Sequence, residues 1–133
     1  MADRAGAHTP PQPLPALAEG QMWTIRDVLE HTRLVVARTE HEGTIVHISV
    51  FGVDVPESAY GPATRITIAH LPFARSSLAH SVLSLISTDA TPAAAFEDGY
   101  AQWKQAKGGI FTLSVKEVID TLIEMRSKRN ASQ

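Results

Sequence analysis

Residues 65–87, RITIAHLPFARSSLAHSVLSLIS, decide how this chain is organised. The first part alternates isoleucine with other residues, as a half-buried strand does, and Pro72 ends the pattern. Ser76 or Ser77 then offers a hydroxyl that can cap the first turn of a helix. Four apolar residues follow at helical spacing, namely Leu78, Val82, Leu85 and Ile86. The stretch predicts a short strand over about 65–70, a turn, and an amphipathic helix.

The residues before this stretch predict β-structure. The runs LVVART and TIVHISVF are rich in β-branched residues and flank a polar loop that ends at Gly43. This pattern is typical of an antiparallel hairpin, with strands over about 33–39 and 44–51. Further upstream, Thr24 and Asp27 are spaced as at the start of a short helix, and a strand there is the open alternative.

The residues after the stretch predict helices. Thr91 and Pro92 combine a capping hydroxyl with a proline suited to the first helical position, and this helix should end at Gly108. Ser114 and Glu117 have the spacing of a capping box, in which each side chain bonds the backbone amide of the other residue. The last helix should bury an apolar stripe formed by Val115, Val118, Ile119, Leu122 and Met125.

Strands early and helices late predict an α+β fold. We expect a small antiparallel sheet of about three strands, beginning with the N-terminal hairpin and covered by three C-terminal helices. Residues 1–19 contain four prolines and predict an extended arm, either free in solution or laid against the domain or a second subunit. The remaining divisions are one domain over 20–129 and a frayed end over 130–133.

The composition excludes several classes of function. There are no cysteines, so disulfides, thiolate zinc sites, iron–sulfur clusters and cysteine nucleophiles are ruled out. A net charge of −2 provides no field that would attract nucleic acid or anionic lipid. No run reaches the roughly 18 apolar residues needed to span a membrane, and the first residues lack the charged and apolar regions expected of a secretory signal. We therefore expect a cytoplasmic protein without nucleic-acid or membrane partners.

The six histidines do not have the spacing of a metal site, so the sequence predicts no metal, cofactor or catalytic residue. His47 and His70 lie on predicted strands and are the natural pair for acid–base chemistry. In a regular strand, however, His47 lies opposite the apolar face formed by Val46, Ile48 and Val50, whereas His70 has the parity of Ile66 and Ile68. The two imidazoles should then point to opposite faces of the sheet, unless a bulge intervenes.

Four residues near the junction of the predicted strand and the following helix suggest an anion-binding site. His70, Arg75, Ser76 and Ser77 would converge at the helix start, where unpaired amides and the helix dipole attract a carboxylate or phosphate. The competing interpretation is architectural. In that reading Pro72 makes the turn, Ser76 caps the helix, and His70 is a hydrogen-bonded core residue.

Tyr100 and Trp103 are three residues apart and neighbour each other on one helix face. Core packing is the favoured role for Trp103, and an exposed pair would instead be suited to anchor a protein interface. The combination of IVHISV, HLPF, a serine-started helix and GYAQW resembles small bacterial proteins of unknown function, over about Gly20 to Arg126. The resemblance implies a bacterial origin and transfers no functional residue.

Two functional hypotheses follow. The first is a non-enzymatic cytoplasmic protein that acts through protein–protein interaction, as a homodimer, an immunity-type protein or a regulatory partner. It rests on the extended arm, the long loop over 52–64, the aromatic helix and the lack of catalytic motifs. The alternative is a small enzyme or anion-binding domain that uses His70 and Arg75.

Overall fold

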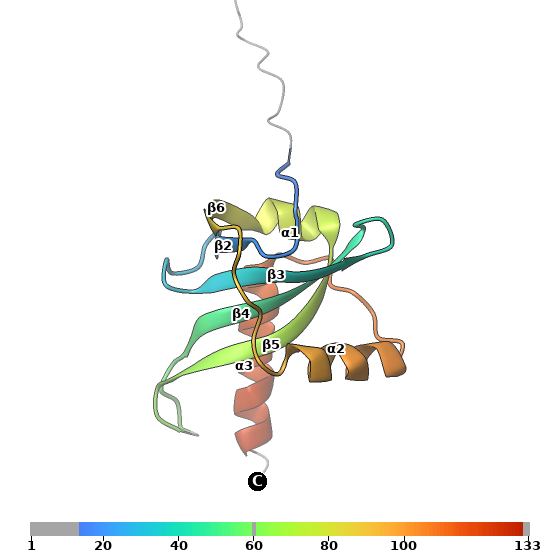
Figure 1. Cartoon of the computed structure of the whole chain (residues 1–133). Helices are drawn as coiled ribbons and strands as arrows, with labels where there is room; N and C mark the ends of the chain where they lie inside the picture. Colours follow the sequence, from blue (N-terminus) through green and yellow to red (C-terminus); the bar gives the residue numbers. More distant parts are fainter. Residues whose placement is uncertain (1–13, 60, 132–133) are drawn as a thin grey trace, which may run out of the picture.

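The computed structural model describes residues 14–59 and 61–131, and this part of the chain forms an α+β fold with an antiparallel sheet of five strands and three helices (Figure 1). The elements in chain order are β2 (Met22–Ile25), β3 (Arg33–Glu40), β4 (Ile45–Val55), β5 (Thr64–Ala74), α1 (Arg75–Ser81), β6 (Val82–Ser87), α2 (Phe96–Gln105) and α3 (Val115–Ala131). The order of strands across the sheet is β5-β4-β3-β2-β6. Strand β6 therefore returns past the hairpin to form one edge.

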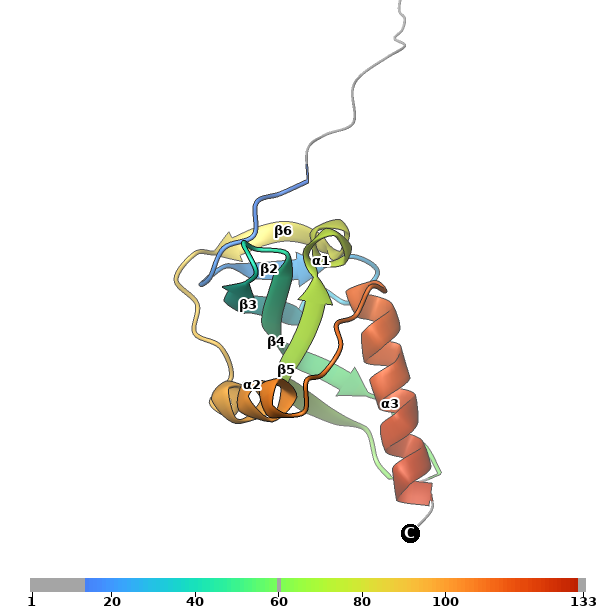
Figure 2. The ribbon, with the colours of Figure 1, turned by 90° about the vertical axis from the view of Figure 1, so that its right-hand side faces the viewer.

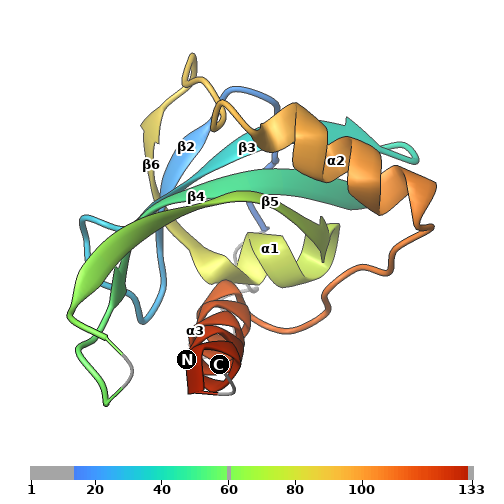
Figure 3. The same cartoon turned by 90° about the horizontal axis from the view of Figure 1, so that it is seen from below.

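The two faces of the sheet are covered by different helices. Helices α1 and α3 lie on one side and α2 on the other (Figure 2, Figure 3). We call the side under α1 and α3 the apolar face. Its fully or nearly buried side chains are Leu34, Val36, Val46, Ile48, Val50, Leu71, Phe73, Leu78, Val115 and Val118. We call the side under α2 the histidine face, because it carries His47.

The predicted hairpin is confirmed, and the prediction of about three strands is too low. Strands β3 and β4 pair antiparallel around a turn in which Gly43 has a φ of +84°, a conformation that glycine adopts without strain. The segment around Thr24 is the strand β2, which was the open alternative to a helix. Strand β6 is the second addition, and it pairs with β2.

The amphipathic helix predicted through Ile86 is wrong beyond Ser81. Residues 82–87 form β6 instead, with Val82 paired to Ile25, and both Leu85 and Ile86 are exposed. A short apolar run fits a strand as well as a helix by periodicity, and pairing with β2 decides between them. The predicted serine cap is also wrong, because α1 starts after Ala74 without any side-chain cap. Two C-terminal helices, not three, therefore follow the sheet.

Pro72 does not end the third strand, which continues to Ala74. Strand β5 lies at an edge of the sheet, where a missing backbone donor is tolerated. The carbonyl of Pro72 accepts a hydrogen bond from the amide of Phe111 at 2.9 Å. The segment leading to α3 thus covers the outer side of this part of β5.

The start of one C-terminal helix agrees with the capping signal in the sequence, and the start of the other does not. Helix α2 begins at Phe96 rather than at Thr91. Helix α3 confirms the capping box, because the Ser114 hydroxyl accepts from the Glu117 amide at 3.1 Å and the Glu117 carboxylate accepts from the Ser114 amide at 3.1 Å. Val115, Val118 and Ile119 are buried as predicted, whereas Met125 at the end of the stripe is exposed.

The described part of the predicted arm, residues 14–19, has no regular secondary structure, and Leu17 packs against the core. The rest of the arm, residues 1–13, lies outside the described part of the chain. Helix α3 runs to Ala131, and the predicted division into arm, domain and frayed end stays a prediction.

Candidate functional site

The structure brings His47 and His70 into direct contact. The Nδ1 atom of His47 lies 2.9 Å from the Nε2 atom of His70, and the rings stack with their centroids 5.0 Å apart. Both imidazoles therefore lie on the histidine face. The expectation that they point to opposite faces is wrong.

A bulge in β5 explains the contact. Ile48 pairs with Leu71 and Val50 pairs with Ile68, so two residues of β4 oppose three of β5. The extra residue reverses the alternation of side chains between Ile68 and Leu71. Ile68 and Leu71 both face the apolar core, and His70 is turned to the opposite side, beside His47.

Glu40, at the end of β3, extends this pair into a network. Its Oε2 atom lies 3.0 Å from Nε2 of His47. Its Oε1 atom accepts from the hydroxyl of Tyr100 and, at 3.0 Å, from the ammonium of Lys104. Tyr100 and Lys104 are one helical turn apart on α2, so the carboxylate connects that helix to the sheet.

The charges of these groups fix the direction of the hydrogen bonds. The hydroxyl of Tyr100, together with His47 and Lys104, lowers the pKa of Glu40 to about 2, so the carboxylate is ionised and can only accept. His47 must then donate from Nε2, and in its neutral form it accepts at Nδ1 from His70. Burial lowers the pKa of His47. Burial, followed by repulsion from His47 once that ring is protonated at low pH, lowers the pKa of His70 to about 4. Both imidazoles are neutral at pH 7.

Helix α2 covers the pair with aromatic side chains. The ring centroids of Tyr100 and Trp103 lie 4.9 Å and 4.6 Å from that of His47, and Phe96 lies 5.5 Å from His70. His47 is fully buried beneath this cover. Through these ring contacts, the two imidazoles of the sheet are packed against α2.

Two further features hold α2 against the sheet. Arg38 donates two hydrogen bonds to the carboxylate of Glu97, at 3.2 Å and 2.8 Å, and its guanidinium lies 4.5 Å from the centre of the Tyr100 ring. Gly99 permits the close approach of the helix, because a Cβ atom there would lie 2.8 Å from Cβ of His70.

The residues of the anion hypothesis lie in two places. His70 belongs to the network under α2. Ser76 and Ser77 line a hollow of about 340 Å³ together with His80, Ser81, Thr112, Leu113 and Ser114. Arg75 is exposed, and its amide donates to the carbonyl of Thr44 at 3.0 Å. With only seven residues, α1 provides little dipole for an anion, and the hypothesis stays a prediction.

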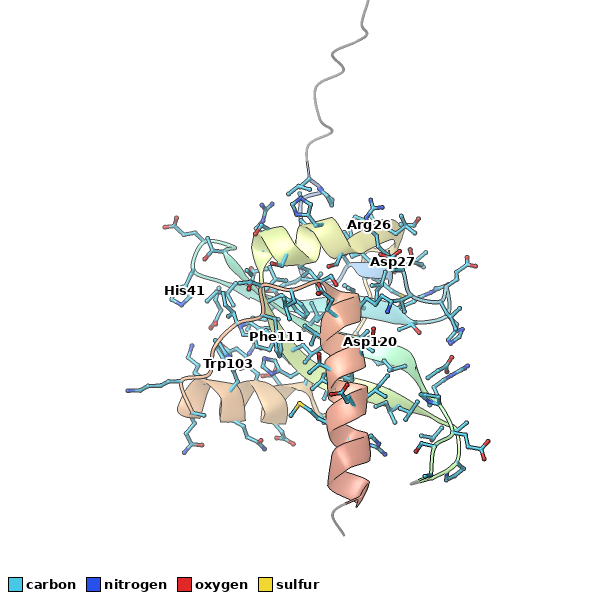
Figure 4. The ribbon with its side chains drawn as sticks, turned by 180° about the vertical axis from the view of Figure 1, so that it is seen from behind. Arg26, Asp27, His41, Trp103, Phe111 and Asp120 are labelled. Atoms are coloured by element: carbon cyan, nitrogen blue, oxygen red, sulfur yellow. The ribbon has the colours of Figure 1, made fainter. Side chains whose placement is uncertain are left out.

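The predicted interface pair points inward. Tyr100 and Trp103 are half-buried against His47, and the indole of Trp103 donates to the carbonyl of Gly109 at 2.8 Å. Figure 4 shows Trp103 on α2 and Phe111 in the segment between α2 and α3. Their role as interface anchors stays a prediction, and their contacts here stabilise the fold.

Strand β6 presents the opposite arrangement, apolar side chains in solvent. Leu83, Leu85 and Ile86 are 54%, 46% and 44% exposed. The strand has no charged residue, and it forms an edge of the sheet, with no further strand beside it among residues 14–59 and 61–131 (Figure 1). The sequence pattern does not predict this surface, because it places Val82, Leu85 and Ile86 on the buried face of a helix. The uncharged, apolar run VLSLIS is the signal that could have found it.

A groove lies beside this edge. It has a volume of about 420 Å³ and is lined by Leu14, Pro15, Trp23, Arg26, Ala79, His80, Val82 and Leu83. The opposite edge of the sheet is different, because β5 carries the exposed Arg65 and is covered near Pro72 by the Phe111 segment. Exposed apolar side chains and an edge of the sheet therefore coincide at β6.

Comparisons with protein-family models, curated proteins and solved structures found no match to this chain. Within the described residues, no helix is both long and apolar enough to cross a membrane. Histidine, aspartate and glutamate side chains in the same part of the chain form no group of three that could hold a metal ion.

Proposed function

We propose that this chain is a non-enzymatic protein-interaction domain that binds a strand of another polypeptide at the β6 edge. The observation that carries the proposal is the exposure of Leu83, Leu85 and Ile86 on an uncharged edge strand. Residence in the bacterial cytoplasm, and the choice between self-association, an immunity-type role and a regulatory role, are predictions within this proposal.

Exposed edges are usually protected in proteins that remain alone. Charged residues, prolines or a covering segment commonly prevent an edge strand from pairing with another chain. The β5 edge has such protection in Arg65, Pro72 and the Phe111 segment. Strand β6 lacks a charge and a proline. An added strand would satisfy its outer backbone groups and cover its apolar side chains, which is how β-strand addition provides affinity.

The geometry favours the alternative, an enzyme or anion-binding domain using His70 and Arg75, less strongly. A catalytic base must reach a substrate proton within hydrogen-bond distance. The imidazole of His70 is instead packed among His47, Phe96 and Tyr100. Arg75 lies at the start of α1, away from these contacts.

Site-specific photo-crosslinking in the native cell tests the proposal. A crosslinking phenylalanine analogue in place of Ile86 should join β6 covalently to a polypeptide, which mass spectrometry identifies. The matched control carries the analogue in place of Leu29, which is also exposed and lies in the turn between β2 and β3. Crosslinks at position 86 and none at 29 are expected. Equal crosslinking at both positions, or none at 86, contradicts the proposal.

A further inference from the structure

We infer that the occupant of the β6 edge is a second copy of this chain, paired antiparallel about a two-fold axis to form a continuous sheet across two protomers. This inference rests on the proposed function and names the partner. It depends on three properties of β6, which are its hydrogen-bond direction, its self-complementary sequence and the charges at its two ends.

The hydrogen bonds of β6 identify the centre of such a pair. The amide of Ser84 points inward and donates to the Thr24 hydroxyl on β2 at 3.0 Å. On the other side of β2, the amide of Val36 donates to the carbonyl of Gln21, so the backbone groups of Gln21 and, two residues on, of Trp23 point toward β3. Leu85 of β6 is paired with Trp23, so its own backbone groups point outward from the sheet. A two-fold antiparallel pair sets one residue opposite its own copy. Leu85 is the residue best placed for this position.

The sequence of β6 suits pairing with itself. With Leu85 at the centre, the exposed leucine of each protomer meets the same leucine of its partner. Ile86 then lies opposite Ser84, and Leu83 opposite Ser87. Residues 82–87 contain no charge, so the pairing places no like charges against one another.

The charges beyond the ends of β6 are complementary in the same arrangement. Arg26 is exposed beside the N-terminal end, where its amide donates to the carbonyl of Ser81 at 2.8 Å (Figure 4). Asp89 is exposed just beyond the C-terminal end. Antiparallel pairing of β6 with its copy brings the N-terminal end of one strand beside the C-terminal end of the other. Arg26 of one protomer and Asp89 of the other therefore lie near the same end of the paired strands, and two-fold symmetry repeats this arrangement.

The register shifts of β6 do not cover its apolar side chains. Two irregularities in its pairing with β2 lie between Met22 and Trp23 and between Trp23 and Ile25. Bulges on an edge usually discourage pairing. Here they accompany four successive exposed residues, 83–86, three of which are large and apolar. The bulges therefore leave these apolar side chains uncovered.

Sedimentation velocity over about 1 to about 200 μM, the range in which weak homodimers form, tests the inference. The full chain should change from monomer to dimer. Leu85→Lys should raise the dissociation constant at least about a hundredfold, because symmetry places each substitution in the interface twice. Leu29→Lys, at another exposed leucine, should leave it unchanged. Circular dichroism and a thermal melt establish that each variant is folded.

Cysteine variants test the arrangement directly, since the chain has no native cysteine. Paired Cα atoms in an antiparallel sheet are about 4.5 to 5.5 Å apart, which is within the reach of a disulfide. Leu85→Cys should form a disulfide-linked dimer under mild oxidation, and Leu29→Cys should not.

The outcomes separate this inference from the proposed function. A chain that stays monomeric at about 200 μM, together with a Leu85→Cys variant that is not linked, overturns the self-pairing. If position 86 still crosslinks to a different polypeptide in cells, the interaction function stands with another partner. Dimers that are equally weakened by Leu85→Lys and Leu29→Lys place the interface elsewhere and overturn the inference as well.

Discussion

The histidine face and the β6 edge reverse the usual distribution of residues. Under α2, His47 is fully buried with His70 and Glu40 beside it, whereas on β6 two leucines and an isoleucine are exposed. Buried polar groups are tolerated when they are hydrogen-bonded, and those of the network are. Exposed apolar side chains that are gathered on a strand edge have no such compensation within one molecule.

This difference assigns separate roles to the two regions. The network of His47, His70 and Glu40 gains its stability inside the fold, because each charge and donor is satisfied by a neighbour. The β6 edge gains stability only when something covers it. The histidines are titratable, but their hydrogen bonds are satisfied inside the fold. The leucines of β6 are exposed, so we expect the interaction surface there.

The largest expected effect comes from breaking the network. Glu40→Ala should reduce the free energy of unfolding by about 3 kcal/mol, or lower Tm by about 10 °C, because it leaves buried donors on His47 and Tyr100 without an acceptor. Thermal and chemical denaturation measure the loss. The control Glu57→Ala, at an exposed position, should change stability by less than about 0.5 kcal/mol. Equal, small effects would show that the network does not stabilise the fold.

The pH dependence of stability should reveal the buried imidazoles. The pKa of His70 is about 4 in the fold against an ordinary value of 6.5. Between these values the unfolded chain binds a proton that the folded protein does not, so stability should fall as the pH is lowered, by about 3 kcal/mol in all. The lowered pKa of His47 acts in the same direction. Between pH 4.5 and about pH 2, Glu40 binds a proton in the unfolded chain but not in the fold, so the loss of stability continues as the pH is lowered.

Substitution of His70 isolates the contribution of this residue to the loss of stability at low pH. His70→Gln keeps a donor toward His47 and removes the titrating group, so stability should depend less steeply on pH between about 6.5 and about 4. His41→Gln, at an exposed turn position, should leave the slope unchanged. Denaturant titrations at several pH values measure both variants. An unchanged slope in His70→Gln would mean that His70 is not held neutral in the fold.

A smaller effect is expected where α2 approaches the sheet. Gly99→Ala should destabilise the protein by about 1 kcal/mol, because overpacking against Cβ of His70 exceeds the gain that alanine brings to a helix. Gly109→Ala is the matched control, since nothing lies within 4 Å of a Cβ atom there. A stabilised Gly99→Ala variant, measured by thermal melts, would show that α2 can move away from the sheet at little cost.

The smallest effect on folding should come from the edge. In dilute solution Leu85→Lys should change the free energy of unfolding by less than about 0.5 kcal/mol, because the side chain is already half in solvent. Chemical denaturation at low protein concentration is the appropriate measurement. A loss as large as that of Glu40→Ala would make Leu85 part of the core and remove the contrast between the regions.

Two local signals in the sequence predicted local structure correctly, whereas the serine cap, the helix start at Thr91 and the strand end at Pro72 did not. The capping box at Ser114 and Glu117 and the hairpin around Gly43 depend on neighbouring residues, and both are present. The class of the fold followed from the order of the strands and helices. The apolar spacing of residues 82–86 fits both the helix and the strand period, and only pairing with β2 makes this segment a strand.

The histidine contact could not be predicted from strand parity. The alternation rule holds within each regular segment, and the bulge between Ile68 and Leu71 interrupts it. No residue in that segment, such as a glycine at positive φ, marks the bulge in the sequence. Glu40, Tyr100 and Lys104 come together across about 60 residues of chain, and such convergence depends on tertiary packing.

Residue-resolved amide hydrogen exchange at low and high protein concentration tests the central claim most directly. If β6 is the surface that acts and the histidine network is the architecture beneath, protection of the Leu85 amide should increase with concentration. The amides of β4 around His47 and of α2 should exchange equally slowly at every concentration. Exchange at Leu85 that does not depend on concentration, with changes confined to α2, would contradict the account.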